Sequence, residues 1–138
     1  MNDKTKIEQV GTVFVPVRNQ DKALDFYTNK LGFEKCVDAF YSDGKRWIEV
    51  APPNSGINLA LVSYDEGKPT TDDRTICAFS TNDIEADYET LQKNNVDIVD
   101  EKIGKKGLFS TNVSVESPMP PQFSFRDPDG NRFLIVEP

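Results

Sequence analysis

The pattern of apolar and polar residues predicts the same order of strands and helices twice along the chain. In the first pass, β-branched and aromatic residues at 10–17 predict a strand, with Pro16 near its end. A capping region at 19–21 then precedes apolar residues at helical spacing, and Gly32 is placed to end that helix. Three further strands are predicted at 33–40, 46–50 and 57–62.

The second pass begins after a polar linker at 64–74. A strand is predicted at 75–80, and Ile84, Tyr88 and Leu91 then share one face of a helix. A short strand follows at 96–99, and an irregular stretch occupies 104–121. The chain closes with strands at 122–126 and 132–136 around an Asp-Pro-Asp-Gly turn, whose carboxylates are expected to cap the turn.

A fixed offset of 63 residues supports an internal duplication, since it aligns Asn19 with Asn82 and Ala23 with Ala86. The predicted fold class is therefore α+β. Two tandem βαβββ modules, at about 10–64 and 75–138, form a curved mixed sheet with the helices outside, within one domain at 1–138. A second similarity, between 42–52 and 128–138, has an offset of 86 residues and is interpreted as two similar Asp-Gly hairpin turns.

Three stretches carry a resemblance to a known family: "VPVRNQDKALDFYTNKLGFE", "AFSTNDIEADYETLQKNNVDIV" and "PPQFSFRDPDGNRFLIVEP". Over about 10–138 the chain resembles the vicinal oxygen chelate superfamily, the glyoxalase/bleomycin-resistance/dioxygenase fold. That fold hosts several chemistries, so the resemblance favours a fold more strongly than a function.

The resemblance also implies where a metal would bind. Enzymes of the family hold one divalent ion with His, Gln or Glu on the first and fourth strand of each module. Those positions fall here on Thr12, Ala60, Ile76 and Leu134, and the chain contains no His. Because none of the four is a donor of the expected kind, we expect no metal, no cofactor and no catalytic residue. A slip in alignment would recruit Glu49, Asn58 or Glu137.

Strand alternation predicts which side chains face a ligand. Trp47, the only tryptophan, shares one face with Glu49, while Ile48 and Val50 face the helices. Phe125, on what is predicted to be an edge strand, is a candidate for stacking on a planar ligand. For this whole set, plain core packing is the alternative. The predicted ligand-contacting residues are Thr12, Phe14, Trp47, Glu49, Ala60, Ile76, Phe125 and Leu134.

Composition narrows the possible partners. The chain has 138 residues with a net charge of −7 and no basic cluster beyond Lys105-Lys106, which argues against nucleic acid and anionic membranes. No long apolar run is present, so a cytoplasmic protein is expected. Cys36 and Cys77 lie in apolar runs and are expected to be buried structural thiols.

The leading hypothesis is a metal-free protein that binds an apolar or cationic small molecule. It would resemble the bleomycin-resistance proteins, which sequester a drug in an apolar groove, and the resemblance implies a homodimer whose paired halves build each groove. One alternative is a glyoxalase-like lyase, isomerase or dioxygenase with an atypical metal site. Another is a regulatory domain with a filled cavity. The 104–121 segment is expected to be a lid or a dimer contact.

Overall fold

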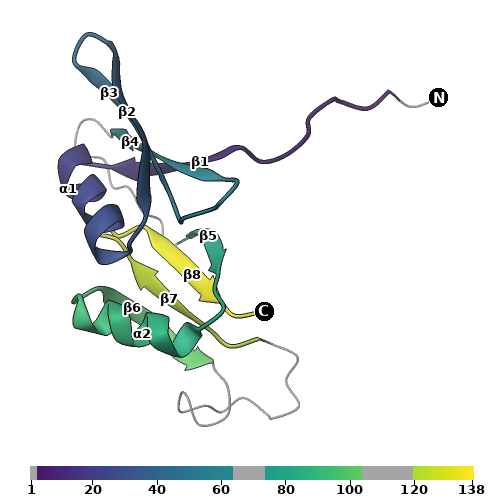
Figure 1. Cartoon of the computed structure of the whole chain (residues 1–138), viewed down its shortest axis with the longest axis vertical. Coiled ribbons are helices and arrows are strands. Elements are labelled where there is room, and N and C mark those ends of the chain that lie inside the picture. The colour runs from purple at the N-terminus through teal and green to yellow at the C-terminus, as the bar shows by residue number, and fades with distance from the viewer. Residues whose placement is uncertain (1–2, 64–73, 104–119) are drawn as a thin grey trace.

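The computed structural model describes residues 3–63, 74–103 and 120–138, and these form two modules of the predicted kind (Figure 1). The first contains β1 (Thr12–Val17), α1 (Gln20–Asp25), η1 (Phe26–Lys30), β2 (Glu34–Ser42), β3 (Lys45–Ala51) and β4 (Asn58–Ser63). The second contains β5 (Thr75–Ser80), α2 (Ile84–Lys93), β6 (Asp97–Ile103), β7 (Gln122–Arg126) and β8 (Arg132–Val136). The predicted α+β fold is confirmed. Most of the 64–74 linker and of the 104–121 segment lies outside the described residues.

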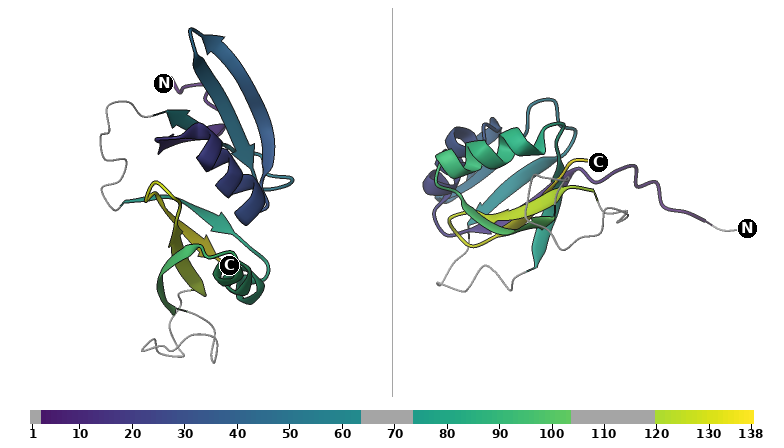
Figure 2. Two further views of the ribbon diagram at one scale, coloured as in Figure 1. Left: turned by 90° about the vertical axis from the view of Figure 1, so that its left-hand side faces the viewer. Right: turned by 90° about the horizontal axis from the view of Figure 1, so that it is seen from below.

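Each module contributes one four-stranded mixed sheet within the described part of the chain. The strand orders are β1-β4-β3-β2 and β5-β8-β7-β6, and the outer pairs β1–β4 and β5–β8 are parallel. Both helices lie on the same side of the sheets, as the right-hand view of Figure 2 shows. Each sheet therefore has one face covered by helices and one open face. No helix in the described residues is long and apolar enough to cross a bilayer.

The first helix ends in a wider turn than the sequence pattern predicts. Asn19 caps its beginning, with its side-chain oxygen accepting from the Lys22 backbone N–H at 2.9 Å. The α-helical bonding then gives way to a π-helical turn, in which the Leu31 N–H donates to the Phe26 carbonyl. Gly32 ends the segment at a φ of +79°, a conformation that glycine adopts without steric cost.

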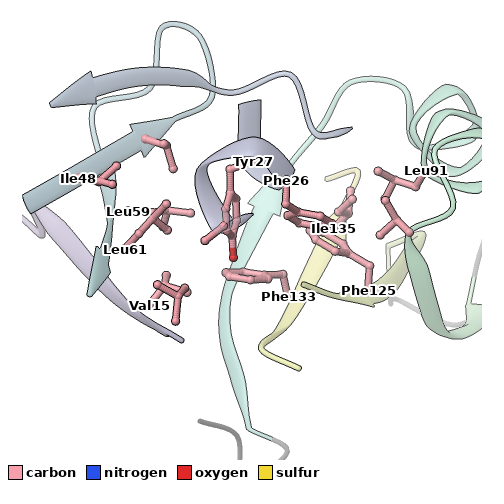
Figure 3. Packing of buried hydrophobic residues seen from close by; sticks show 14 of the residues in the cluster. Val15, Phe26, Tyr27, Ile48, Leu59, Leu61, Leu91, Phe125, Phe133 and Ile135 are labelled. Carbon is pink, nitrogen blue, oxygen red and sulfur yellow. The ribbon is translucent and has the colours of Figure 1, made fainter. Parts of the chain in front are cut away.

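The helix-covered faces of both sheets share one hydrophobic core (Figure 3). In the first module, Ile48, Val50 and Leu59 are buried there, as alternation predicts. In the second module, Phe133 stacks against Phe79 and Phe125 at ring-centroid distances of 5.3 and 5.5 Å. Because one cluster spans both modules, the burial of apolar surface also holds the two modules together.

The closing turn is fastened to the first module by hydrogen bonds. The Asp127 carboxylate accepts from the backbone N–H groups of Asp129 and Asn131 and from the Asn131 side chain, at 2.8–2.9 Å. It also accepts from the Tyr27 hydroxyl on η1 at 2.7 Å. The Asn131 amide donates in turn to the Pro16 carbonyl on β1 at 2.8 Å. The predicted turn-capping role of Asp127 is therefore accompanied by a link between the modules.

Burial gives these groups unusual proton affinities. Asp127 is 5% exposed, and its desolvation raises the carboxyl pKa, an effect that the bonds from Asn131 and Tyr27 only partly offset. Tyr27 is fully buried, and desolvation together with the neighbouring Asp127 raises its pKa well above the usual value. The phenol therefore stays protonated and donates to Asp127 at neutral pH.

The prediction of two buried thiols is wrong for Cys36. Cys36 is exposed on β2, where a register irregularity between Lys35 and Val37 interrupts the pairing with β3. β2 is an edge strand, and all nine of its residues are exposed, so an apolar stretch of sequence does not lead to burial there. Cys77 on β5 is half-buried.

Candidate ligand-binding face

The open face of the first sheet carries a row of side chains that crosses all four strands. Phe14 on β1 pairs with Ala60 on β4, Ala60 pairs with Glu49 on β3, and Glu49 pairs with Val37 on β2. Directly paired residues point to the same side of a sheet, so these four belong to one face. The structure thus brings together three predicted residues, Phe14, Ala60 and Glu49, with Thr12 exposed two positions before Phe14.

Glu49 is held in place by two neutral donors. The Trp47 indole N–H donates to one carboxylate oxygen at 2.6 Å, and the Asn58 side-chain amide donates to the other at 2.8 Å. Across 3–63, 74–103 and 120–138, the Glu49 carboxylate forms no salt bridge. Each oxygen keeps a further lone pair, so the oriented carboxylate can accept a donor from a bound molecule.

Aromatic rings surround this carboxylate. Phe14 and Trp47 meet edge to face with ring centroids 5.8 Å apart, and Tyr41 meets Trp47 in the same way at 6.3 Å. Phe14 is 63% exposed, an unusual position for a large apolar side chain. A hollow of about 240 Å³ lies beside Trp47 and Tyr41. The face therefore presents aromatic surface to the outside, next to the fixed negative charge of Glu49, and Lys45 and Arg46 also line the hollow.

The open face of the second sheet has a different character. Leu134 on β8 is half-buried and pairs with Ala78 on β5, while Ser124 on β7 pairs with Leu134 from its other side. Ile76 is half-buried and packs against the core. These side chains are small or aliphatic, and Arg126 pairs with Arg132 further along the same face. The aromatic and acidic groups of the predicted site therefore belong to the first module.

Phe125 does not lie on either open face. It is 1% exposed, points under the helices and stacks with Phe133 and Phe79. Its strand, β7, lies between β8 and β6 and is not the edge strand that the sequence suggested. Because β7 is an inner strand, an aromatic side chain on its helix-covered face packs in the core.

The four residues that the family resemblance places at metal positions do not fit a divalent ion. Thr12, Ala60, Ile76 and Leu134 supply at most one neutral oxygen, and Ala60 is fully buried. Among the described residues, no three His, Cys, Asp or Glu side chains gather closely enough to hold a metal.

The two carboxylates that an alignment slip would recruit, Glu49 and Glu137, accept hydrogen bonds from different parts of the fold. Glu137 accepts from the Ile84 backbone N–H at 2.9 Å, at the beginning of α2, whereas Glu49 bonds to its own sheet. Each of the two carboxylates is thus engaged in hydrogen bonds within its own module.

Two contributors to the face were absent from the predicted site. Asn58 lies two residues before Ala60 on β4 and therefore points to the same face, so strand alternation could have predicted it. Tyr41 lies at a register irregularity between Phe40 and Ser42, which the sequence pattern does not reveal.

Comparisons with known proteins agree with this architecture. Residues 9–135 match the sequence model described as the Glyoxalase/Bleomycin resistance protein/Dioxygenase superfamily. The uncharacterized protein YetH of Bacillus subtilis (strain 168) is 30% identical over 131 residues, which cover 95% of this chain and 99% of YetH.

Solved structures give a similar result. TnmS3, an antibiotic binding protein from Streptomyces sp. CB03234, is 31% identical with a TM-score of 0.77, over 98% of this chain and 99% of its own. A superfamily member from Sphaerobacter thermophilus DSM 20745 is 30% identical with a TM-score of 0.77, over 97% and 100% of the two chains.

Proposed function

Because this chain belongs to the glyoxalase/bleomycin resistance protein/dioxygenase superfamily, we propose that it binds a small organic molecule on the open face of its first module, without a metal ion. The observation that carries the proposal is the Glu49 carboxylate, held by Trp47 and Asn58 beside the exposed ring of Phe14. Similarity to the antibiotic-binding TnmS3 supports a small-molecule ligand. The absence of suitable donors at the family's four metal positions favours binding without a metal.

The chemistry of the face favours a flat apolar molecule that carries a hydrogen-bond donor, best of all a cationic one. A planar body gains contact with the rings of Phe14 and Trp47, and a cation gains a further attraction to those rings. An ammonium or amidinium group also meets the charge of Glu49, which forms no salt bridge with the described residues, in a charge-assisted hydrogen bond. The net charge of −7 also favours a cationic ligand.

We further propose that a second copy of the chain closes the face. Phe14, Val37 and Tyr41 are all exposed large apolar residues of the first module, and such clusters mark interaction surfaces. In a homodimer, the open face of one copy's second module, which includes Ala78, Ser124 and Leu134, would provide the opposite wall. Light scattering after size-exclusion chromatography tests this proposal, and we expect a molar mass twice that of the 15.5 kDa chain. In a Phe14→Lys variant, the molar mass should fall towards that of a single chain. Cytoplasmic location stays a prediction from the sequence.

Trp47 provides a direct test of ligand binding because it is the chain's only tryptophan. We would titrate the protein at neutral pH with 9-aminoacridine, a planar cation, and with acridine, its neutral relative, and follow Trp47 fluorescence. A charge-assisted bond contributes about 1.5–3 kcal/mol, so the cation should bind about tenfold more tightly or better.

The variant Glu49→Gln should remove this preference, because it keeps the shape and loses the charge. The matched control Glu89→Gln, on an exposed position of α2, should keep it. Equal affinities for the two dyes in the unmodified protein would contradict the proposed ligand class. Stoichiometric zinc, nickel, manganese or iron in the purified protein would contradict the metal-free part.

A further inference from the structure

We propose that the seam between the two modules holds a second binding site, for a small uncharged apolar molecule. A hollow of about 400 Å³ opens there, between the first sheet, the turn that joins β3 to β4, and β5. That volume lies within the range of about 300–1,000 Å³ typical of ligand pockets. Its walls include Val13, Pro52, Ile57, Leu59, Cys77 and Phe79.

The seam hollow lies on the opposite side of the first sheet from the proposed ligand face. Val13 and Leu59 alternate along their strands with Phe14 and Ala60, and adjacent residues of a strand point to opposite faces. A molecule in the seam hollow therefore does not contact Trp47 or Glu49. The two proposed sites share no residue of the first module, so variants of that module test them separately, although Ala78 lines the seam hollow and also lies on the open face of the second sheet.

The lining of the seam hollow selects against charge. Its walls are mostly apolar, and none of the described residues that form them is an Asp, Glu, Lys or Arg. The single thiol is also neutral, because burial raises the pKa of Cys77 to about 11. A charged molecule would lose its hydration here without a compensating partner, whereas an uncharged ring would lose little.

The walls are held apart by contacts outside the hollow. The Phe79 ring is fixed by Phe133 and Phe33, each at a centroid distance of 5.3 Å. The opposite wall is stiffened by Pro52 and by Ser55, whose hydroxyl bonds to both backbone groups of Ile57 at 3.0 and 3.2 Å. Because neither wall is free to collapse, the lining atoms lack contacts that an apolar ligand would supply.

A smaller hollow adjoins the first and sets how a ligand can extend. It measures about 140 Å³ and shares Pro52, Phe79 and Ser80 with the larger one. Its own lining adds Lys30 and Asp87. A fused bicyclic ring such as indole therefore suits the larger hollow, and polar extensions would point towards the smaller one.

Cysteine labelling tests the seam site without any variant. Iodoacetamide labelling of the full chain, read by peptide mass spectrometry, reports Cys77 in the seam hollow and Cys36, exposed on β2, as an internal control. Indole at about twice its Kd should slow labelling of Cys77 about threefold and leave Cys36 unchanged. Tryptamine, a cation of similar shape, should not protect Cys77 at the same concentration. Absence of indole protection, or equal protection by tryptamine, overturns the proposal.

A filled hollow gives the second arm of the experiment. Ile57→Trp enlarges a side chain that lines the hollow from an exposed position just before β4, so indole should add no further protection of Cys77. Ala86→Trp, on the exposed side of α2, should behave as the unmodified protein does. Protection that is lost in Trp47→Ala would place indole on the open face instead. Cys77 protection that grows with protein concentration would show that the seam is an interface between copies. Either result overturns the proposal.

Discussion

Two hairpin turns with nearly the same sequence have opposite environments in this molecule. Ser42-Asp43-Gly44-Lys45 joins β2 to β3, and Asp127-Pro128-Asp129-Gly130-Asn131 joins β7 to β8. Both glycines have positive φ, +69° at Gly44 and +88° at Gly130. The first turn lies at the exposed tip of a hairpin that projects from the body (Figure 1), while Asp127 in the second is buried against Tyr27. Local chemistry is enough to make a turn, but it does not decide whether the turn contributes to the core.

The strands that follow the two turns differ in the same way. In β3, Trp47 and Glu49 occupy the open face and Ile48 is buried. When the two turns are aligned, Phe133 and Ile135 of β8 correspond to Trp47 and Glu49 of β3. Phe133 and Ile135, however, are buried in the core. A shift of one residue in a strand exchanges the two faces, so similar sequence leads here to a ligand-facing strand in one module and a core strand in the other.

Aromatic truncation tests this exchange of faces with the largest expected effect. Phe133→Ala removes a fully buried ring that packs against Phe79, Phe125 and Tyr27, and should lower the free energy of unfolding by about 3–5 kcal/mol. Trp47→Ala, at a half-exposed position, should cost about 1–2 kcal/mol. Urea unfolding followed by circular dichroism measures both. Equal losses would mean that the two rings are buried alike.

Removing the two turn carboxylates tests the turns themselves. Asp127→Ala leaves several donors without their acceptor, including the buried Tyr27 hydroxyl, and should cost about 2–4 kcal/mol. Asp43→Ala alters an exposed side chain and should stay within about 0.5 kcal/mol. The same urea titration compares the two variants. Matching midpoints would contradict a structural role for the Asp127 link.

The pH dependence of unfolding sharpens the comparison further. The raised pKa of Asp127 means that the folded state binds this proton more tightly than the unfolded state does. Its contribution to stability therefore falls as pH rises from the ordinary Asp value of 3.8 through the raised one. Relative to Asp127→Asn, the unmodified protein should lose stability as the pH rises above the ordinary Asp value of 3.8, with a variant of the exposed turn, Asp43→Asn, as the matched control. A flat difference between the protein and Asp127→Asn would contradict this.

The smallest effect concerns a carboxylate near the exposed hairpin. Hydrogen bonds from Arg46 lower the pKa of Asp38 to about 2, the opposite direction from Asp127. The resulting stabilisation is present above the ordinary Asp pKa and is lost as pH falls through about 2. In Arg46→Gln, the Asp38 pKa should return towards 3.8, measured by NMR titration of its side-chain carbon. A pKa that stays near 2 would assign the shift to another group.

Much of the fold was readable from the sequence because it depends on neighbours along the chain. Strands 75–80, 122–126 and 132–136 have the predicted bounds, and the positive-φ glycines lie where turns were expected. Alternation also assigned Trp47 and Glu49 to the face opposite Ile48 and Val50, since the period of two is a property of the strand itself.

Only the tertiary structure decided which of these elements are covered. Phe125 was expected near a ligand and lies in the core, because β7 is an inner strand under α2. Cys36 was expected in the core and is exposed, because β2 is an outer strand. The bond between Tyr27 and Asp127 joins residues 100 positions apart. Burial depends on what packs across from a side chain, and residues far away in the chain supply those contacts.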